Sequence, residues 1–201
     1  SIPGKAKRAI FRSQQLCEKE DWPGSIKLLR DCLTKSPDQD RYLLRFYLAN
    51  SLTKIDSLET AVQHYQKAVS LNSEFINGWL NLAETAYATE QYATAGDAFE
   101  KAFRLKETPT QYLLYYAGVC NSLANRNSKA LILLQELLLT GEPKPDWLQT
   151  TVAVAMEVSE SAVAQKVVNQ FCEIYPENPS AWLLAYQFYA AENDYENAAS
   201  A

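Results

Sequence analysis

The sequence has few of the residues that build catalytic or nucleotide-binding loops. It contains six scattered glycines, a single histidine and four cysteines without CxxC spacing. Isolated glycines cannot form a loop that wraps a phosphate with backbone amides, and one histidine leaves a Cys/His zinc site short of ligands. We therefore expect no bound nucleotide, no metal and no cofactor.

Positive charge and long apolar runs are also scarce. The net charge is −5 and the pI is near 5.0, whereas nucleic acid and anionic lipid are bound by clustered Lys and Arg. The local cations Lys5, Lys7, Arg8 and Arg12 are followed by acidic residues, which favours a solvated helix face. No run reaches the roughly 18 apolar residues of a membrane span. The sequence predicts neither a nucleic-acid partner nor insertion into a membrane.

A catalytic set is not recognisable either. His64 has no Cys, Ser or Asp pattern around it, and it is expected to be a packed or exposed residue of a helix. The acidic pairs, such as Glu157 with Glu160, are ordinary for a helical surface. We therefore predict that the protein is not an enzyme.

The four cysteines are Cys17, Cys32, Cys120 and Cys172. Each falls where a helix would place a small buried side chain, so they are predicted to be unreactive core thiols. A disulfide between Cys17 and Cys32 stays open if one hairpin brings them together. Unpaired thiols fit a cytoplasmic location, whereas a periplasmic location would require a leader peptide, and the sequence shows no such pattern.

What the sequence does contain is helix-forming residues in a regular pattern. Apolar residues make up 47% of the chain, and Ala, Leu, Gln, Glu and Lys dominate its long segments, which favours helix. Small residues recur about every 34 positions, at Ser25, Ala61, Ala95, Ala130, Ala164 and Ala198. Four positions after the first five of these comes a bulky residue: Leu29, Tyr65, Phe99, Leu134 and Val168. Because residues i and i+4 share a helix face, each unit contains a helix with a small contact point and a bulky stripe.

A second helical pattern precedes each small residue, so that each unit is predicted to be a helical hairpin. Prolines follow several hairpins, at Pro37, Pro109, Pro143 and Pro176, where they stop a helix from continuing. We predict one array over residues 1–201, with approximate units 6–41, 42–75, 76–109, 110–144, 145–178 and a truncated 179–201. The chain lacks an initiator Met and stops within a motif, so we expect further residues to continue or cap the array.

The pattern W-x-x-L-[GA] … A-x-x-x-[FY]-x-x-A … P resembles the tetratricopeptide repeat (TPR). It is carried most fully by Trp79, Leu82, Ala83, Ala95, Phe99 and Ala102. The resemblance implies an all-α fold, a right-handed superhelical solenoid of stacked antiparallel helical hairpins. A lone hairpin cannot bury its apolar face, so the next hairpin covers it, and large residues such as Trp79 are expected to be buried between hairpins.

The resemblance also implies a function in holding a protein or peptide in a concave groove lined by the first helix of each hairpin. The matching partner-binding positions are Phe46, Asn50, Lys54, Asn77, Asn81, Glu84, Tyr87, Gln111, Leu114, Tyr115 and Asn121. Asn and Gln suit the backbone of an extended peptide, and the aromatic residues suit its apolar side chains. An alternative left open is that these aromatic residues pack between hairpins.

One specificity of the family is not expected here. Members that bind chaperone tails clamp a C-terminal carboxylate with paired Asn and several basic residues, and the basic positions here hold Phe46, Gln111 and Tyr115. We expect no such clamp. The other function left open is a structural scaffold, in the style of bacterial envelope or assembly proteins, that uses its ends or its convex face.

Overall fold

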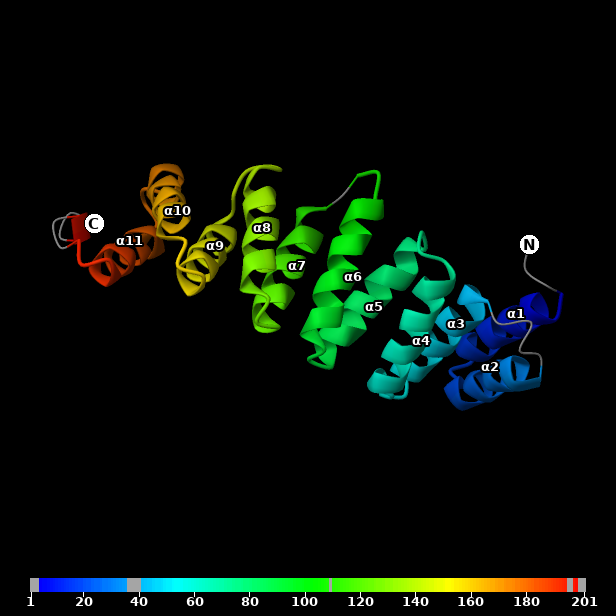
Figure 1. Cartoon of the computed structure of the whole chain (residues 1–201). Coiled ribbons are helices and arrows are strands. Elements are labelled where there is room, and N and C mark those ends of the chain that lie inside the picture. The colour runs from blue at the N-terminus through cyan, green and yellow to red at the C-terminus, as the bar shows by residue number, and fades with distance from the viewer. Residues whose placement is uncertain (1–3, 36–40, 109, 195–196, 199–201) are drawn as a thin grey trace. The chain divides into compact units, whose positions relative to one another are not determined.

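The computed structural model describes residues 4–35, 41–108, 110–194 and 197–198 (Figure 1). All regular structure in this part of the chain is helical. The helices are α1 (Gly4–Glu18), α2 (Trp22–Lys35), α3 (Tyr42–Thr53), α4 (Leu58–Leu71), α5 (Ile76–Ala88), α6 (Tyr92–Leu105), α7 (Gln111–Leu123), α8 (Asn127–Leu138), α9 (Pro145–Glu157), α10 (Ser161–Ile174) and α11 (Pro179–Ala191). The all-α prediction is confirmed. None of these helices has the length and apolar character needed to cross a bilayer.

The helices pair into hairpins, and the hairpins stack within two compact units. The hairpins are α1–α2, α3–α4, α5–α6, α7–α8 and α9–α10, each with its two helices packed together. Unit 1 is Ser1–Pro109 and unit 2 is Thr110–Ala201. In unit 1, α2 packs on α3 and α4 on α5; in unit 2, α8 packs on α9 and α10 on α11. The division between the units coincides with a predicted repeat boundary.

The small residues of the repeat pattern lie in the core, as predicted. Five of the six are fully buried and Ala198 is 6% exposed. The bulky residues that follow them, from Leu29 to Val168, are at most 5% exposed. Close packing is clearest between α7 and α8, where a Cβ on Gly118 would lie only 2.7 Å from side-chain carbons of Leu134. Small side chains therefore let the helices of a hairpin approach each other.

The turn inside each hairpin has one repeated geometry. A non-glycine residue with φ of 58–59° lies five positions before each small residue: Glu20, Asp56, Glu90, Asn125, Ser159 and Asn193. In the third hairpin, the N–H of Glu90 donates to the carbonyl of Tyr87, and the N–H of Gln91 donates to the carbonyl of Ala86. The same pair of bonds recurs in the other five turns. This is the Schellman arrangement, which satisfies the last carbonyls of the first helix.

Trp79 is not buried between hairpins as expected. It is half-buried, and its indole Nε1 donates to the carbonyl of Ser73 at 2.8 Å. Trp182, at the same repeat position, is 38% exposed and donates to the carbonyl of Pro176 at 2.7 Å. The indole has an apolar body and a polar edge, so it covers the core with one end and fastens the preceding turn with the other.

The cysteines are all unbridged, so the disulfide between Cys17 and Cys32 is not formed. The Cys17 thiol instead lies 3.5 Å from the hydroxyl of Ser25. Of the four thiols predicted to be buried, Cys120 is fully buried and the other three are half-buried. Burial raises the pKa of the Cys120 thiol to about 12. A thiol with so high a pKa stays protonated and is a poor nucleophile at neutral pH.

Candidate partner-binding surface

The predicted surface is best developed in unit 1, where two asparagines from neighbouring hairpins meet. Asn50 lies on α3 and Asn81 on α5, and Asn81 Nδ2 donates to Asn50 Oδ1 at 3.0 Å. Tyr65, on α4, donates its hydroxyl to the same Asn50 oxygen at 2.6 Å. Asn81 Nδ2 also lies 3.3 Å from the Tyr65 oxygen. The sequence placed both asparagines on one face, and the structure brings them into direct contact.

These bonds occupy only one end of each amide. Asn50 Nδ2 and Asn81 Oδ1 make no hydrogen bond with any residue that the structure describes. A side-chain amide carries two N–H donors and a carbonyl with two lone pairs. The pair therefore offers a donor on α3 and an acceptor on α5, side by side on a half-buried surface.

A cavity of about 280 Å³ adjoins this pair of amides. Its lining consists of Thr53, Leu58, Tyr65, Asn81, Glu84, Thr85 and Ala88. Glu84 supplies the only formal charge of the lining, and it is exposed. We call Asn50, Asn81 and this cavity the amide site. Its chemistry is hydrogen bonding beside a small pocket with one negative charge.

Tyr65 supports the amide site from below: it lies on α4, the second helix of its hairpin, and donates to Asn50. Its side chain is 2% exposed, and this burial raises the pKa of the phenol. The hydroxyl therefore keeps its proton and remains a donor to Asn50 at neutral pH. Sequence reasoning assigned Tyr65 to the bulky stripe of the core and missed its role here. The available signal was that a Tyr, unlike Phe or Leu, needs a partner for its buried hydroxyl.

The other predicted residues of unit 1 differ in how much surface they offer. Phe46 is half-buried, and its ring packs edge-on against Phe75 with centroids 4.9 Å apart. Lys54 lies at the end of α3, with Nζ 6.0 Å from the centre of the Trp22 ring. Asn77 and Glu84 are exposed, and Tyr87 is 40% exposed. Phe46 thus follows the alternative in which an aromatic residue packs between hairpins.

In unit 2, the predicted polar residues are engaged within the protein. Gln111 Nε2 donates to the carbonyl of Thr140 at 3.1 Å. The hydroxyl of Tyr115, on α7, lies 3.3 Å from that of Thr150, on α9. The Tyr115 ring also packs near Trp147, with centroids 6.4 Å apart. The Tyr115 contacts join the first helices of two successive hairpins, whereas the Gln111 bond ties the start of α7 to the segment after α8.

Leu114 and Asn121 do not lie on the surface. Both are fully buried, so they belong to the core rather than to the partner-binding set. The physical reason is their helical spacing: with Ala117 between them, they follow i, i+3, i+7 along one face of α7, and that face is the buried one. Asn121 Nδ2 donates to the Ala117 carbonyl at 2.8 Å, while its Oδ1 has no partner.

The described residues contain no cluster of metal-ligating side chains. Groups of three or more His, Cys, Asp or Glu placed to hold a metal are absent from them. His64 Nδ1 lies 3.3 Å from a guanidinium nitrogen of Arg45.

Several solved structures share this fold. YrrB, a TPR protein with an unusual peptide-binding site, matches with a TM-score of 0.59 and 21% identity over 85% of this chain and 86% of its own. The C-terminal part of a TPR repeat-containing protein from Cytophaga hutchinsonii matches with a TM-score of 0.61 and 15% identity, over 96% and 79%. The complex of Naa15/Naa10 bound to HypK-THB matches with a TM-score of 0.77 and 14% identity, over 97% of this chain but 30% of the other.

No protein-family model matches the sequence, and no curated protein matches it significantly. The similarity to known proteins is therefore a similarity of fold. The repeat motif in the sequence and the solved structures point to the same fold. Eleven helices in the described part of the chain correspond to about five and a half repeats. The protein is an all-α helical solenoid with the fold of the tetratricopeptide-repeat proteins.

Proposed function

We propose that the protein is a non-catalytic binding module that holds an extended segment of a partner protein at the amide site. The observation that carries this proposal is the contact between Asn50 and Asn81, which leaves one donor and one acceptor open to a ligand. A peptide bond presents the complementary pair, a carbonyl and an N–H. Asn50 Nδ2 would donate to the carbonyl of the segment, and Asn81 Oδ1 would accept from an N–H.

The surroundings of the two amides favour a neutral or apolar stretch of the partner. The adjoining cavity of about 280 Å³ can take one small side chain beside Leu58. Tyr87, 40% exposed, offers an aromatic surface further along α5. Glu84 would repel a terminal carboxylate, so an internal segment of a chain fits better than its C-terminus.

Two further facts support a binding module over an enzyme. A protein of the same fold, YrrB, is described as having a peptide-binding site, and another, Naa15/Naa10, is described as bound to HypK. In this chain, the amide site is a cluster of hydrogen-bonding groups from three helices, and it contains no nucleophile paired with a base. The fold supports a role in protein interaction, and the open donor and acceptor of the amide site are the reason for proposing a peptide segment as the ligand.

The test is affinity capture with the full chain from a lysate of the source organism, read by mass spectrometry. A variant with Asn50→Ala, Asn81→Ala and Tyr87→Ala is compared with a control that carries Gln63→Ala, Gln66→Ala and Gln165→Ala on exposed positions of second helices. We expect a protein that is captured by the wild type and the control and lost with the first variant. Circular dichroism confirms that all three chains are folded.

A photo-crosslinker at Glu84 makes the assignment sharper. Replacing this exposed residue by p-benzoylphenylalanine should attach the captured protein covalently, and the same replacement at Gln63 should not. Crosslinked peptides then identify the bound segment. Equal capture by both triple variants, with no crosslink from position 84, would refute the amide site as the binding surface.

The second candidate function is a scaffold that binds through second helices of unit 2. Ile132 and Leu139 of the α8 segment are 65% and 87% exposed, although the same repeat positions hold Lys27 and Thr34 in the first hairpin. Leu139 also lines a groove of about 660 Å³ between α8 and α10, together with apolar residues that include Leu138, Val163 and Val167. An amphipathic helix of a partner would fit such a groove. In that case, capture is lost with Ile132→Ser and Leu139→Ser and kept when the amide site is changed.

A further inference from the structure

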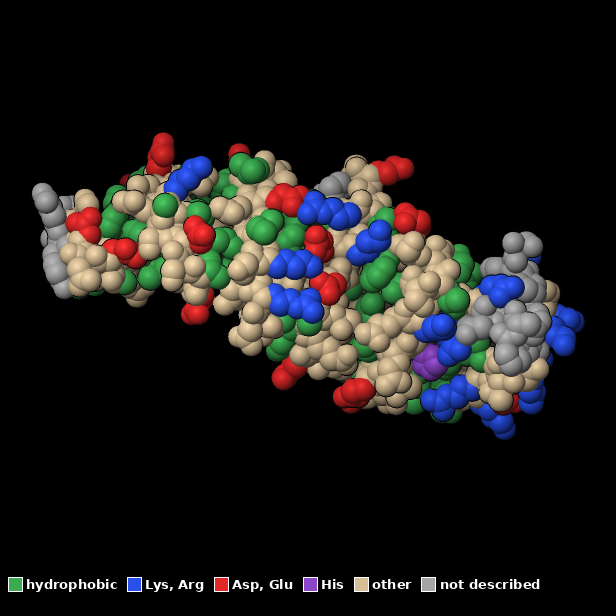
Figure 2. Space-filling view, in the orientation of Figure 1, with side chains coloured by type: hydrophobic (Ala, Val, Ile, Leu, Met, Phe, Trp, Pro, Cys, Tyr) green, Lys and Arg blue, Asp and Glu red, His purple; other side chains and the backbone are tan. Residues whose placement is uncertain are grey.

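The first hairpin differs in charge from the rest of the chain. Residues 4–35 hold eight Lys and Arg against four Asp and Glu, whereas the remaining residues hold eleven against twenty. The hairpin is therefore net positive by four charges on a protein whose net charge is −5. Figure 2 shows Lys and Arg side chains at the end of the molecule formed by α1 and α2, whereas in the middle of the molecule Lys and Arg lie among Asp and Glu side chains. Such a separation attracts an anionic partner to one end of unit 1.

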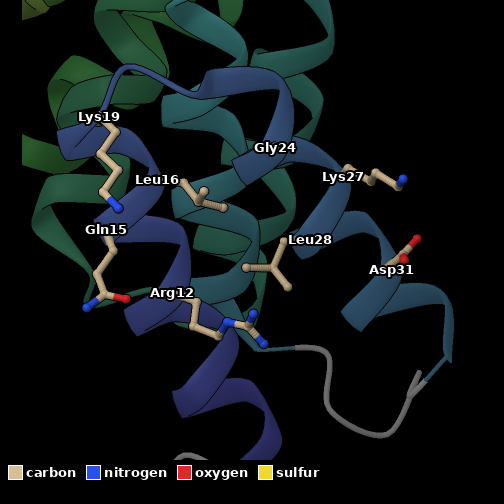
Figure 3. A pocket seen from close by; sticks show the side chains of 8 residues that line it. All are labelled: Arg12, Gln15, Leu16, Lys19, Gly24, Lys27, Leu28 and Asp31. Carbon is tan, nitrogen blue, oxygen red and sulfur yellow. The ribbon is translucent and has the colours of Figure 1, made fainter.

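A groove runs between the two helices of this hairpin. It has a volume of about 410 Å³ and is lined by Arg12, Gln15, Leu16 and Lys19 of the α1 region and by Gly24, Lys27, Leu28 and Asp31 of α2. Figure 3 shows Leu16 and Leu28 turned toward each other between the helices, with the guanidinium of Arg12 at one end of the groove and Lys19 toward the other. We call this the basic groove.

The basic groove combines an apolar floor with unpaired cations. Leu16 and Leu28 are half-buried, so part of each side chain remains open to a ligand. Arg12, Lys19 and Lys27 are exposed and form no hydrogen bond or ion pair with any described residue. The acid in the lining, Asp31, is paired with Lys35 at 2.9 Å, so its charge is partly neutralised and does not occupy the other cations.

Comparison with other hairpins shows that this face has unusual chemistry. The equivalents of Arg12, Gln15 and Leu16, read at the repeat period, are Leu48, Ser51 and Leu52 in the second hairpin, Leu82, Thr85 and Ala86 in the third, and Thr151, Val154 and Ala155 in the fifth. All nine are at most 8% exposed. Arg12 and Gln15 are exposed instead. A second helix of the ordinary apolar kind could not cover this face without burying a guanidinium, which is costly unless the charge is paired.

We propose that the basic groove is a second interaction surface, distinct from the amide site, that binds an acidic segment of a partner protein. Asp and Glu side chains of the segment pair with Arg12, Lys19 and Lys27, and one apolar side chain between them packs on Leu16 and Leu28. Arg12 contributes most, since a guanidinium can hold a carboxylate with two hydrogen bonds. The positive charge of the groove favours an acidic partner segment, and the narrow apolar floor favours an apolar residue within that segment.

Other anions fit the basic groove less well. Single-stranded nucleic acid is bound by aromatic platforms along a basic track, and no aromatic residue lines this groove. A membrane surface attracts a broad polybasic patch, whereas the acidic remainder of the chain would be repelled by anionic lipid. A protein segment can supply both an apolar side chain for Leu16 and Leu28 and carboxylates for the surrounding Arg12, Lys19 and Lys27.

The experiment is a peptide array of randomised eight-residue sequences probed with the full chain. We expect enrichment of Asp and Glu on both sides of a Leu, Ile or Phe. The best peptide, labelled with fluorescein, should lose about tenfold or more in affinity with Arg12→Glu and Lys19→Glu, because attractive charge pairs become repulsive. Exchange of its apolar residue for Ser should also weaken binding, and raising NaCl from about 0.05 to about 0.3 M should do so as well.

The control has the same change in net charge at other positions. Lys67→Glu and Lys166→Glu alter exposed lysines of α4 and α10 and should leave the affinity within about twofold, since they lie outside the basic groove. Equal loss in both variants would mean that only overall charge matters, and it would overturn the proposal. An array without acidic enrichment would do the same, as would tighter binding to phosphatidylserine vesicles or heparin fragments with the same dependence on Arg12. The variant with Asn50→Ala, Asn81→Ala and Tyr87→Ala keeps this binding, which separates the two surfaces.

Discussion

The first helices of unit 1 and unit 2 have the same place in the repeat but use their polar side chains differently. In unit 1, Asn50 and Asn81 bond to each other and still leave a donor and an acceptor open. In unit 2, Gln111 and Tyr115 are bonded to Thr140 and Thr150. The difference teaches that residue type at a repeat position does not identify a binding residue. What matters is whether its hydrogen-bonding capacity is already used inside the protein.

The largest expected effect tests whether Leu114 belongs to the core of unit 2. Leu114→Ala removes a fully buried side chain and should lower the free energy of unfolding by about 2–5 kcal/mol, measured by urea denaturation. The control is Asn77→Ala in unit 1, an exposed residue, which should stay within about 0.5 kcal/mol. An equally small effect for both variants would mean that Leu114 is not a core residue.

The second prediction compares the two surfaces directly. Asn81→Ala should weaken binding of the captured segment by about tenfold or more, since the ligand loses an acceptor and Asn50 loses a partner. Gln111→Ala should change the affinity by less than about threefold, because its Nε2 is already bonded to the Thr140 carbonyl. Fluorescence anisotropy with a labelled peptide measures both. A larger loss with Gln111→Ala than with Asn81→Ala would indicate that the partner binds to unit 2 instead.

The third prediction concerns a feature that the two units share. Trp79→Phe and Trp182→Phe keep an aromatic ring but remove the indole bond to the Ser73 or Pro176 carbonyl. Each should lower the free energy of unfolding by about 1 kcal/mol. A loss of 3 kcal/mol or more in either variant, on the scale of a lost core aromatic, would show that the tryptophan is buried after all. Thermal unfolding followed by circular dichroism gives the comparison.

The smallest expected effect is a gain in stability at the turns. Glu90 holds φ of 58°, a conformation that costs an ordinary residue about 1–2 kcal/mol and glycine little. Glu90→Gly in unit 1 and Ser159→Gly in unit 2 should each raise the free energy of unfolding by about 0.5–1 kcal/mol. Asn125→Gly should gain less, because Asn tolerates this region. Gln66→Gly, inside α4, is the opposite control and should destabilise by about 1 kcal/mol.

The sequence predicted the architecture well because that information is periodic. The small residues from Ser25 to Ala164 are fully buried, as their spacing required. The packing of successive hairpins within each unit follows from the same repeat, since every hairpin has one apolar face to cover. A single array was predicted over the whole chain, and its division into two compact units, which falls at a repeat boundary, was not foreseen.

The amide site, proposed here as the binding surface, was harder to predict because it depends on contacts between helices. Asn50 and Asn81 were placed on one face, but nothing in their spacing indicates that Tyr65 bonds to both. Asn121 was assigned to the groove, although it shares the buried face of α7 with Ala117. A shift of one residue along a helix turns a side chain by about 100°, the angle set by 3.6 residues per turn. Repeat registers therefore locate helices more reliably than they orient single side chains.

The geometry of the turns inside the hairpins was also not predicted, because the residue with positive φ in each turn is not a glycine. Gly is the usual residue at this place in a Schellman turn, yet Glu20, Asp56 and Glu90 hold it here. Their conformation is imposed by the packing of the two helices that they join. Sequence alone showed only that a break falls between two helical patterns.

The six turns have a consequence for how the protein can change over time. Each is a site where a single substitution by glycine should add stability, and four of them, at Glu20, Asn125, Ser159 and Asn193, lie in hairpins that contribute no residue to the amide site. Most mutations that create a new function lower stability, and a lineage can accept them only while it stays above a threshold. Because stabilising substitutions are still available at these turns, the chain could compensate for destabilising mutations elsewhere, including those that change its proposed binding surfaces. The repeated turn is thus a source of evolvability.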